Sequence, residues 1–291
     1  MEPLATLLDR DEGKGILTPD LKELYGGDLS LPPPPDQRPH VAINFVRTVD
    51  GPITFNIPGK EGGGEISGKN PQDGFIMGLL RAVFGNMGEG ANAVRLNPMH
   101  LWTPSFASKE HTVLFEQLRE RLGETGKYRT FFFTGTGNIM PVTKPGPPLP
   151  PRTPLVLQSE ASEAWVITTR RGREITLSQY PFLDGRVVAF GNTDTVDVRE
   201  AFGFLREKLG VKHLLIEGGA TFAGSVIKAG LYDELFLTES NIIAGNSRES
   251  GRSTFVWDAL FSPEDAPRHN LVSLKIDGRE GNEIFERWRR R

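Results

Sequence analysis

Residue types suited to binding a phosphate follow position 212. The apolar run HLLI leads into Glu217, Gly218 and Gly219, and a helical pattern continues over residues 220–229. Backbone N–H groups at a helix N-terminus attract anions, and glycines leave that backbone accessible because they lack a Cβ. The pattern suits a dinucleotide pyrophosphate. A tight strand-to-helix turn that only needs small residues has the same pattern, and the GxGxxG fingerprint is absent.

Three further polar positions allow either chemistry or a structural role. Glu217 follows a strand, where ligands of open α/β sheets bind, but it could equally cap the next helix. Asn44 interrupts the apolar run 41–46 and would contact a ligand or lie on a sheet face. Asp50 precedes a glycine, which is an ordinary hairpin-turn pair. The glycines at 85, 88 and 90 form a weak phosphate-loop pattern, since no Lys-Ser/Thr pair follows them.

Apolar periodicity predicts the elements that position these residues. Helices are expected over 71–83, 111–122, 198–209 and 220–229, and strands over 41–46, 130–134, 164–168, 186–190, 213–216 and 235–238. A final pair of runs, 271–276 and 283–288, predicts a hairpin. A proline-rich loop is expected at 141–152. The alternation predicts an α/β fold with a mostly parallel central sheet flanked by helices and a C-terminal antiparallel hairpin.

The N-terminal part has a different character. A short amphipathic helix is expected around residues 4–8, with little else before residue 30 that could form a core, and LPPPPD at 31–36 is a stiff polyproline spacer. We therefore divide the chain into an N-terminal extension, 1–37, and a main domain, 38–291.

Composition excludes several classes of protein. The 291 residues contain no cysteine, which removes disulfide scaffolds, cysteine-ligated zinc, iron–sulfur clusters and thiol nucleophiles, and no metal site is predicted. With 34 Lys+Arg against 37 Asp+Glu there is no basic footprint for nucleic acid. No apolar run approaches the roughly 20 residues of a membrane span, and the N-terminus lacks a secretory signal pattern. We expect a cytoplasmic protein with a small-molecule substrate.

Four segments, in order, resemble one known family. They are RPHVAINFVRTVDG at 38–51, GGGEISGKNPQDGFIMGLLRA at 62–82, GANAVRLNPMHLWTP at 90–104 and IEGGATFAGSVIKAGLYDELFLTESNIIAG at 216–245. Together they are similar to the pyrimidine reductase family of riboflavin biosynthesis, a dihydrofolate-reductase-like domain often fused to a zinc deaminase. The deaminase is absent here, because the chain has no cysteine for its zinc site.

The resemblance implies NADPH-dependent hydride transfer to the ribosyl carbon of an aminopyrimidine ribose phosphate, in a homodimer. It implies cofactor contacts from Gly90, Ala91, Asn92, Ala93, Thr134, Gly135, Gly218, Gly219, Ala220 and Thr221. It implies substrate contacts from Gly63, Glu65, Ser67 and Arg81, the last as a phosphate ligand unless it is a solvated helix-end arginine. Asn44, Asp50 and Glu217 occupy catalytic positions of the family, with Glu217 facing the pyrimidine and Asp50 also open to the turn role. Arg170, Arg171 and Arg173 could bind the cofactor's 2′-phosphate or be solvated.

Residues 84–90, FGNMGEG, depart from the apolar strand that the family has here. Three glycines, an asparagine and Glu89 make a poor buried strand, and a buried Glu89 without a partner is costly. The segment is expected to be a loop, a strand of altered register or a mark of lost activity. Two alternatives to the pyrimidine reductase therefore remain: a reductase of another heterocycle or imine, and a nucleotide-binding protein without turnover.

Overall fold

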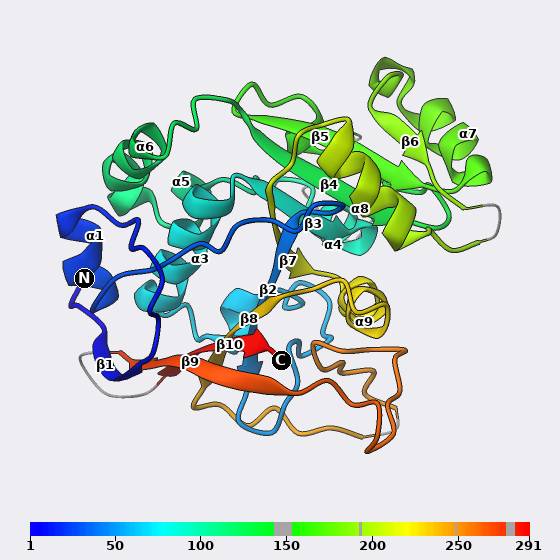
Figure 1. Ribbon diagram of the computed structural model, residues 1–291. Helices are drawn as coiled ribbons and strands as arrows, with labels where there is room; N and C mark the ends of the chain where they lie inside the picture. The colour runs from blue at the N-terminus through cyan, green and yellow to red at the C-terminus, as the bar shows by residue number, and fades with distance from the viewer. Residues whose placement is uncertain (143–152, 192–193, 248, 278–282) are drawn as a thin grey trace.

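A single mixed sheet forms the centre of the molecule (Figure 1). The computed structural model describes residues 1–142, 153–191, 194–247, 249–277 and 283–291. Within these residues the strand order is β1-β9-β10-β8-β2-β7-β3-β4-β5-β6. The strands are β1 (Ala5–Asp9), β2 (His40–Thr48), β3 (Asn86–Gly90), β4 (Tyr128–Thr134), β5 (Ser162–Thr168), β6 (Val187–Ala189), β7 (His213–Gly218), β8 (Glu234–Ser240), β9 (His269–Ile276) and β10 (Glu283–Arg290). In this order, each pair of neighbouring strands from β8 to β6 is parallel, whereas β10 is antiparallel to both of its neighbours, β8 and β9. This arrangement confirms the predicted fold class and the predicted C-terminal hairpin.

Helices cover both faces of this sheet. The helices are α1 (Pro19–Tyr25), α2 (Gly63–Ile66), α3 (Pro71–Phe84), α4 (Ala91–Leu96), α5 (Pro104–Ala107), α6 (Thr112–Arg121), α7 (Arg170–Gln179), α8 (Val198–Glu207) and α9 (Ala220–Lys228), with 3-10 turns at Lys109–His111, Leu155–Leu157 and Pro181–Leu183. In β2, Val41 and Ile43 pack with α8 and α9, whereas Ala42 packs with α3 and α6. Successive strand residues point to opposite faces, so the central strands are apolar on both sides. The predicted proline-rich loop lies, after its first two residues, outside the described residues.

The glycine-rich segment 86–90 is a strand. β3 is buried along its whole length and pairs in parallel with β4 and β7. Ile216 and Phe222 fill the space above Gly88, since a Cβ there would lie 3.4 Å from each of them. Of the three alternatives for this segment, the loop was therefore wrong, and the segment forms a strand because neighbouring side chains supply the packing that the glycines lack. The pairing with β7 shifts by one residue between Gly88 and Glu89.

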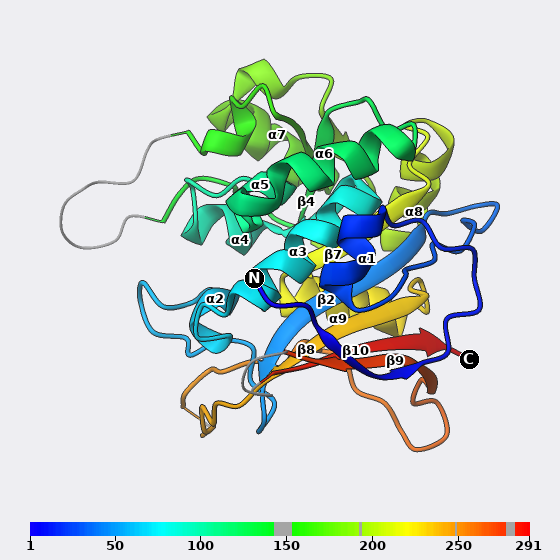
Figure 2. The same ribbon diagram turned by 90° about the vertical axis from the view of Figure 1, so that its left-hand side faces the viewer.

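The N-terminal segment is part of the sheet. Residues 5–9 form strand β1, antiparallel to β9, and the predicted helix at 4–8 was wrong because pairing with a free sheet edge outweighs a short amphipathic pattern. The expectation of no core before residue 30 was also wrong, since Leu17, Leu21 and Leu29 are at most 1% exposed and pack with α3. Figure 2 shows α1 beside α3 and β1 beside β9.

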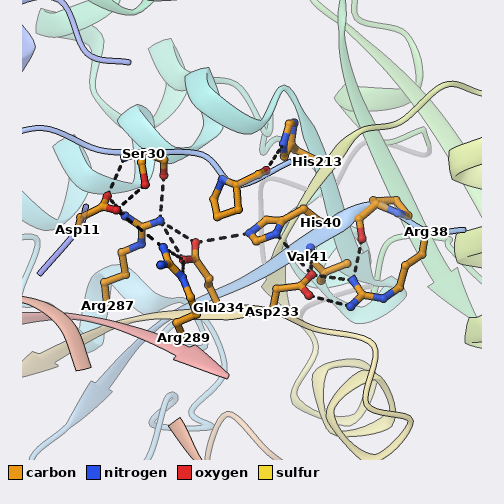
Figure 3. Close-up of polar contacts among 12 residues, drawn as sticks. Asp11, Ser30, Arg38, His40, Val41, His213, Asp233, Glu234, Arg287 and Arg289 are labelled. Atoms are coloured by element: carbon orange, nitrogen blue, oxygen red, sulfur yellow. Dashed lines mark hydrogen bonds and ion pairs between the residues drawn. The ribbon is translucent and has the colours of Figure 1, made fainter. Parts of the chain in front are cut away.

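A buried group of charged side chains ties this segment to the sheet (Figure 3). Arg287 on β10 contacts Asp11 Oδ2 at 2.6 Å and both carboxylate oxygens of Glu234 at 2.9 Å. It also donates to the Ser30 carbonyl, and the Ser30 N–H and hydroxyl donate to Asp11. Arg289 donates to Glu234 at 2.9 Å. His40 lies 3.5 Å from Glu234 and 3.6 Å from Asp233, and Asp233 in turn pairs with Arg38 at 2.6 Å. We call Asp11, Glu234 and Arg287 the anchor cluster.

Acidification is expected to weaken the anchor cluster. Burial alone would raise the pKa of Asp11, but the Ser30 hydrogen bonds and the Arg287 charge lower it to about 2. Burial would likewise raise the pKa of Glu234, but the His40 hydrogen bond and the Arg287 charge lower it to about 2. Both shifts are downward, so their stabilisation is complete above about pH 5 and is lost as the pH falls toward 2. We expect on the order of 2 kcal/mol from each carboxylate. Urea unfolding of the wild type between pH 5 and 2 should show a steeper loss of stability than Asp11→Asn, and equal slopes would contradict the assignment.

Candidate active site

A cavity of about 980 Å³ opens at the carboxyl ends of the central parallel strands. The ends of β2, β3, β4 and β7 contribute to its wall, as do α3 and the N-terminal residues of α4 and α9. Ligands of open α/β sheets bind at this edge, where successive strands deliver side chains and helix N-termini to one place. The volume is at the upper end of the usual range for small-molecule sites, roughly 300–1,000 Å³, so a ligand of dinucleotide size fits.

An ion pair lies in the wall of this cavity. Arg81 Nε of α3 donates to Glu217 Oε2 of β7 at 2.8 Å, and the side chains are only 2% and 4% exposed. The remaining guanidinium nitrogens contact the Thr103 carbonyl at 3.2 Å and His100 Nε2 at 3.2 Å. The second carboxylate oxygen, Glu217 Oε1, is buried and has no hydrogen-bond partner among the described residues. Arg81 therefore orients Glu217 and leaves one of its oxygens available as an acceptor.

A second carboxyl group lies beside this pair. Glu89, near the end of β3, is 1% exposed, and its Oε1 has no partner. Burial raises the pKa of Glu89 well above its usual range; the negative charge of Glu217 raises it further, and Arg81 and a hydrogen bond with Trp102 oppose the shift. Burial next to Arg81 lowers the pKa of His100 to about 3. At neutral pH His100 is therefore neutral, and the surroundings of Glu89 favour its protonated form.

The carboxyl group of Glu89 occupies space left by Gly218. A Cβ on Gly218 would lie 2.0 Å from Glu89 Oε2. Gly219, with φ +82°, lies against Gly90, and a Cβ there would come within 2.8 Å of the Gly90 Cα. The two glycines thus have different roles: Gly218 makes room for a side chain, and Gly219 allows the turn before α9 to approach β3 closely.

Most of the predicted site residues meet at this cavity. Its lining includes Asn44, Gly63, Arg81, Gly90, Ala91, Asn92, Ala93, Thr134, Gly135, Glu217, Gly218, Gly219, Ala220 and Thr221. Arg81 is buried and ion-paired, so the alternative of a solvated helix-end arginine was wrong. With its guanidinium held by protein groups, Arg81 has a visible role toward Glu217, and its contact with a substrate phosphate stays a prediction.

Three predicted residues lie outside the lining. Asp50 is exposed and accepts hydrogen bonds from the Thr48 hydroxyl and from the N–H groups of Ala244 and Gly245, so the structure gives it the turn role and does not bring it to the cavity. Glu65 lies 3.8 Å from Lys69, its neighbour one turn along. Ser67 is buried and hydrogen-bonds to Asp73.

The predicted 2′-phosphate arginines are also absent from the lining. Arg170, Arg171 and Arg173 begin α7, and Arg173 pairs with Asp184 at 3.0 Å. Within the described residues, no group of three or more histidine, aspartate or glutamate side chains could hold a metal ion. No helix among these residues has the length and apolar character to cross a bilayer.

Sequence reasoning missed four residues of the site. Glu89, Asp73, His100 and Trp102 line the cavity. Burial raises the pKa of Asp73 to about 6, against hydrogen bonds from Thr238 and Ser67. The available signal for Glu89 was a charged residue where the family has an apolar strand, which was interpreted as a defect of the strand. His100 and Trp102 lie in the segment 90–104, which resembles the family, but the resemblance assigned them no role.

Fold and site together define a class: an α/β protein with a nucleotide-sized cavity at the carboxyl ends of a parallel sheet, beside a glycine turn that starts a helix. The chain belongs to the RibD C-terminal domain family, whose model matches residues 39–255. This membership confirms the family resemblance of the four sequence segments.

Individual relatives agree with this assignment. The riboflavin biosynthesis protein RibD of Bacillus amyloliquefaciens is 26% identical over 147 residues, covering 46% of this chain and 38% of that protein. A pyrimidine reductase-like protein of Corynebacterium diphtheriae superimposes with a TM-score of 0.63 at 18% identity, over 87% of this chain and 92% of the other. RibD of Acinetobacter baumannii superimposes with a TM-score of 0.55 at 15% identity, over 88% of this chain and 59% of that protein.

A third structure has a more explicit description. The diaminohydroxyphosphoribosylaminopyrimidine deaminase/5-amino-6-(5-phosphoribosylamino)uracil reductase of Thermotoga maritima gives a TM-score of 0.53 at 18% identity, over 88% of this chain and 57% of that one. At such identities these structures show a shared fold. The chain spans well under two thirds of the two RibD proteins and of the Thermotoga enzyme.

Proposed function

We propose that this protein is an NADPH-dependent reductase of 5-amino-6-(5-phosphoribosylamino)uracil in riboflavin biosynthesis. Membership of the RibD C-terminal domain family supports the reaction class. The proposal rests on the buried Arg81–Glu217 ion pair at the cavity. In this pair, Glu217 Oε1 has no hydrogen-bond partner within the part of the chain that the structure describes. A pyrimidine ring presents N–H groups that suit such an oxygen, and a carboxylate held by an arginine is a strong, oriented acceptor.

The lining residues fit a nicotinamide dinucleotide. Gly90 and Gly219 approach each other so closely that bare backbone forms this part of the wall, and the first N–H groups of α9 belong to the same surface. Residues 218–221 would hold the pyrophosphate, residues 90–93 the nicotinamide half, and Thr134 and Gly135 the adenosine ribose. The cofactor supplies the hydride, and the protein positions the acceptor carbon and excludes water.

NADPH binding is the first test of this function. Two of the four tryptophans, Trp102 and Trp257, line the cavity, so quenching of tryptophan fluorescence should report binding. We expect saturable quenching with NADPH preferred over NADH, followed by loss of NADPH absorbance when the substrate is added. Binding of neither cofactor would contradict the proposal.

Glu217→Gln is expected to weaken substrate binding more than cofactor binding. Glutamine keeps the shape but removes the charge that pairs with Arg81, and a charge-assisted hydrogen bond contributes roughly 1.5–3 kcal/mol. KM for the pyrimidine should therefore rise on the order of tenfold or more, with the Kd for NADPH nearly unchanged. Steady-state kinetics and the fluorescence titration measure the two effects. An equal loss of both affinities would contradict a role in orienting the substrate.

We further propose a homodimer in the cytoplasm, as the family resemblance implies. Light scattering coupled to size-exclusion chromatography gives the mass in solution. Twice 32.2 kDa would support the dimer, and the mass of one chain would contradict it.

A further inference from the structure

Glu89 lies between the two halves of the proposed site. It is the penultimate residue of β3, paired with Phe132 of β4 on one side and with Gly218 of β7 on the other. The next residues, 90–93, are those assigned to the nicotinamide half, and the neighbouring Glu217 is assigned to the pyrimidine. A group at this position lies in the cavity wall between the residues assigned to the cofactor and the residue assigned to the substrate, near where the reacting carbon would lie.

Burial and the charges around Glu89 favour its protonated form. From α3, Arg81 supplies one positive charge, which its 2.8 Å contact commits to Glu217 of β7. His100, in the loop before α5, is neutral at neutral pH because its pKa is lowered to about 3. Two buried carboxyl groups therefore lie beside one cation, and such an arrangement favours a proton on the carboxyl group that lacks the direct ion pair. The proton is therefore favoured on Glu89, whose Oε1 has no hydrogen-bond partner among the residues that the structure describes.

The surrounding backbone is built to admit this side chain. Any side chain at Gly218 would collide with Glu89 Oε2, at 2.0 Å from the first added carbon. A charged residue type inside a buried strand is costly, and an apolar residue would fill the same place without an unsatisfied oxygen. A protonated carboxyl group that is buried, unsatisfied and at a ligand cavity is the arrangement of a general acid.

We propose that Glu89 is the proton donor of this enzyme, protonating the sugar ring oxygen of the substrate; this rests on the proposed function. The anomeric carbon gains a hydride from the nicotinamide dinucleotide, and its bond to the ring oxygen breaks. The electron pair of that bond stays on the oxygen, which takes the proton of Glu89 and becomes a hydroxyl group. Glu89 is left as a carboxylate beside Arg81 and is reprotonated by solvent after product release.

The test compares Glu89→Gln with the wild type. Glutamine keeps the size and can still donate a hydrogen bond, but it cannot give up a proton. We expect kcat to fall by about 100-fold or more, while KM and the Kd for NADPH stay near their wild-type values. The wild-type kcat should decline as the pH rises through the pKa of Glu89, above the usual carboxyl range, and this decline should be missing in the variant. Glu89→Asp, which keeps the acid, should recover part of the activity.

Infrared spectroscopy gives a readout that is independent of turnover. The wild type should show a protonated carboxyl band at neutral pH that Glu89→Gln removes. The matched control is Glu283→Gln, because Glu283 is buried outside the cavity and its pKa is raised to about 9, by burial first and then by Asp73 and Asp277. The control should also lose a carboxyl band but keep its kcat.

Each failure has its own signature. A Glu89→Gln variant with wild-type kcat, or with an unchanged carboxyl band, overturns the role of Glu89 while the reductase function stands. Equal losses of kcat in the two glutamine variants overturn it as well, since they would report damage to the fold. Wild-type protein that neither binds NADPH nor consumes it with the substrate overturns the function itself, and the proposal with it.

Discussion

Arg287→Met is expected to lower the free energy of unfolding by about 3–5 kcal/mol. Arg287 is 2% exposed and is the shared cation of Asp11 and Glu234, at 2.6 and 2.9 Å. Without it, two carboxylates remain in the interior with fewer partners, and the cost of desolvating them is no longer offset. The N-terminal segment loses its main polar contact with β10. Urea unfolding at neutral pH measures the change.

The matched control is Arg290→Met on the same strand. Arg290 is exposed, donates to the Gly230 carbonyl and lies 5.3 Å from the centre of the Tyr232 ring, so its loss should cost no more than about 1 kcal/mol. The difference in the free energy of unfolding between Arg287→Met and the wild type should also become smaller in acid, because protonation of Asp11 and Glu234 removes the charges left unpaired. A deficit below about 1 kcal/mol at neutral pH would show that the anchor cluster contributes little.

Gly219→Ala is expected to weaken NADPH binding on the order of 10- to 100-fold. The residue has φ +82°, which alanine adopts only with strain, and the added Cβ would lie 2.8 Å from the Gly90 Cα and 2.9 Å from its nitrogen. Backbone atoms cannot rotate away as a flexible side chain can, so the ends of β3 and β7 must separate. Loss of even one aligned hydrogen bond to a charged phosphate corresponds to roughly 1.5–3 kcal/mol.

Gly126→Ala is the control for this substitution. No atom lies within 4 Å of a Cβ at Gly126, its φ is not left-handed, and it is outside the cavity. Fluorescence titration should give wild-type NADPH affinity for Gly126→Ala and weak binding for Gly219→Ala, with thermal unfolding confirming that both fold. Unchanged affinity in Gly219→Ala would remove the glycine turn from the proposed cofactor site.

Sequence patterns predicted the central elements because their signals are local. The helical spacing over 71–83 and the run 213–216 into two glycines correspond to α3 and β7 within a few residues. The strand β1 was not predicted, and β3 was expected only as one of three alternatives, because the stability of both strands comes from residues distant in the sequence. β1 depends on the free edge of β9, and β3 depends on side chains of β7 and α9 that fill the space above its glycines.

The site residues likewise divide into those predicted from local patterns and those that depend on residues distant in the sequence. Glycines and strand-end residues were placed at the cavity because motif order and sheet topology fix them. The role of Arg81 could not be predicted, since its partner Glu217 is 136 residues away and only tertiary packing brings them within 2.8 Å. Glu89 was judged a defect because its cost is visible in the sequence, whereas the space left by Gly218 is visible only in three dimensions.

The anchor cluster also bears on the order of folding events. Ala5 pairs with Ile276, and Asp11 pairs with Arg287, which lies 276 residues further along the chain. Contacts of such long sequence separation form slowly, because a long loop must close before they stabilise anything. Until residue 287 has been made, Asp11 and Glu234 lack Arg287 and β9 presents an unpaired edge. A growing chain therefore stays open to chaperones and to misassociation until β10 has been made.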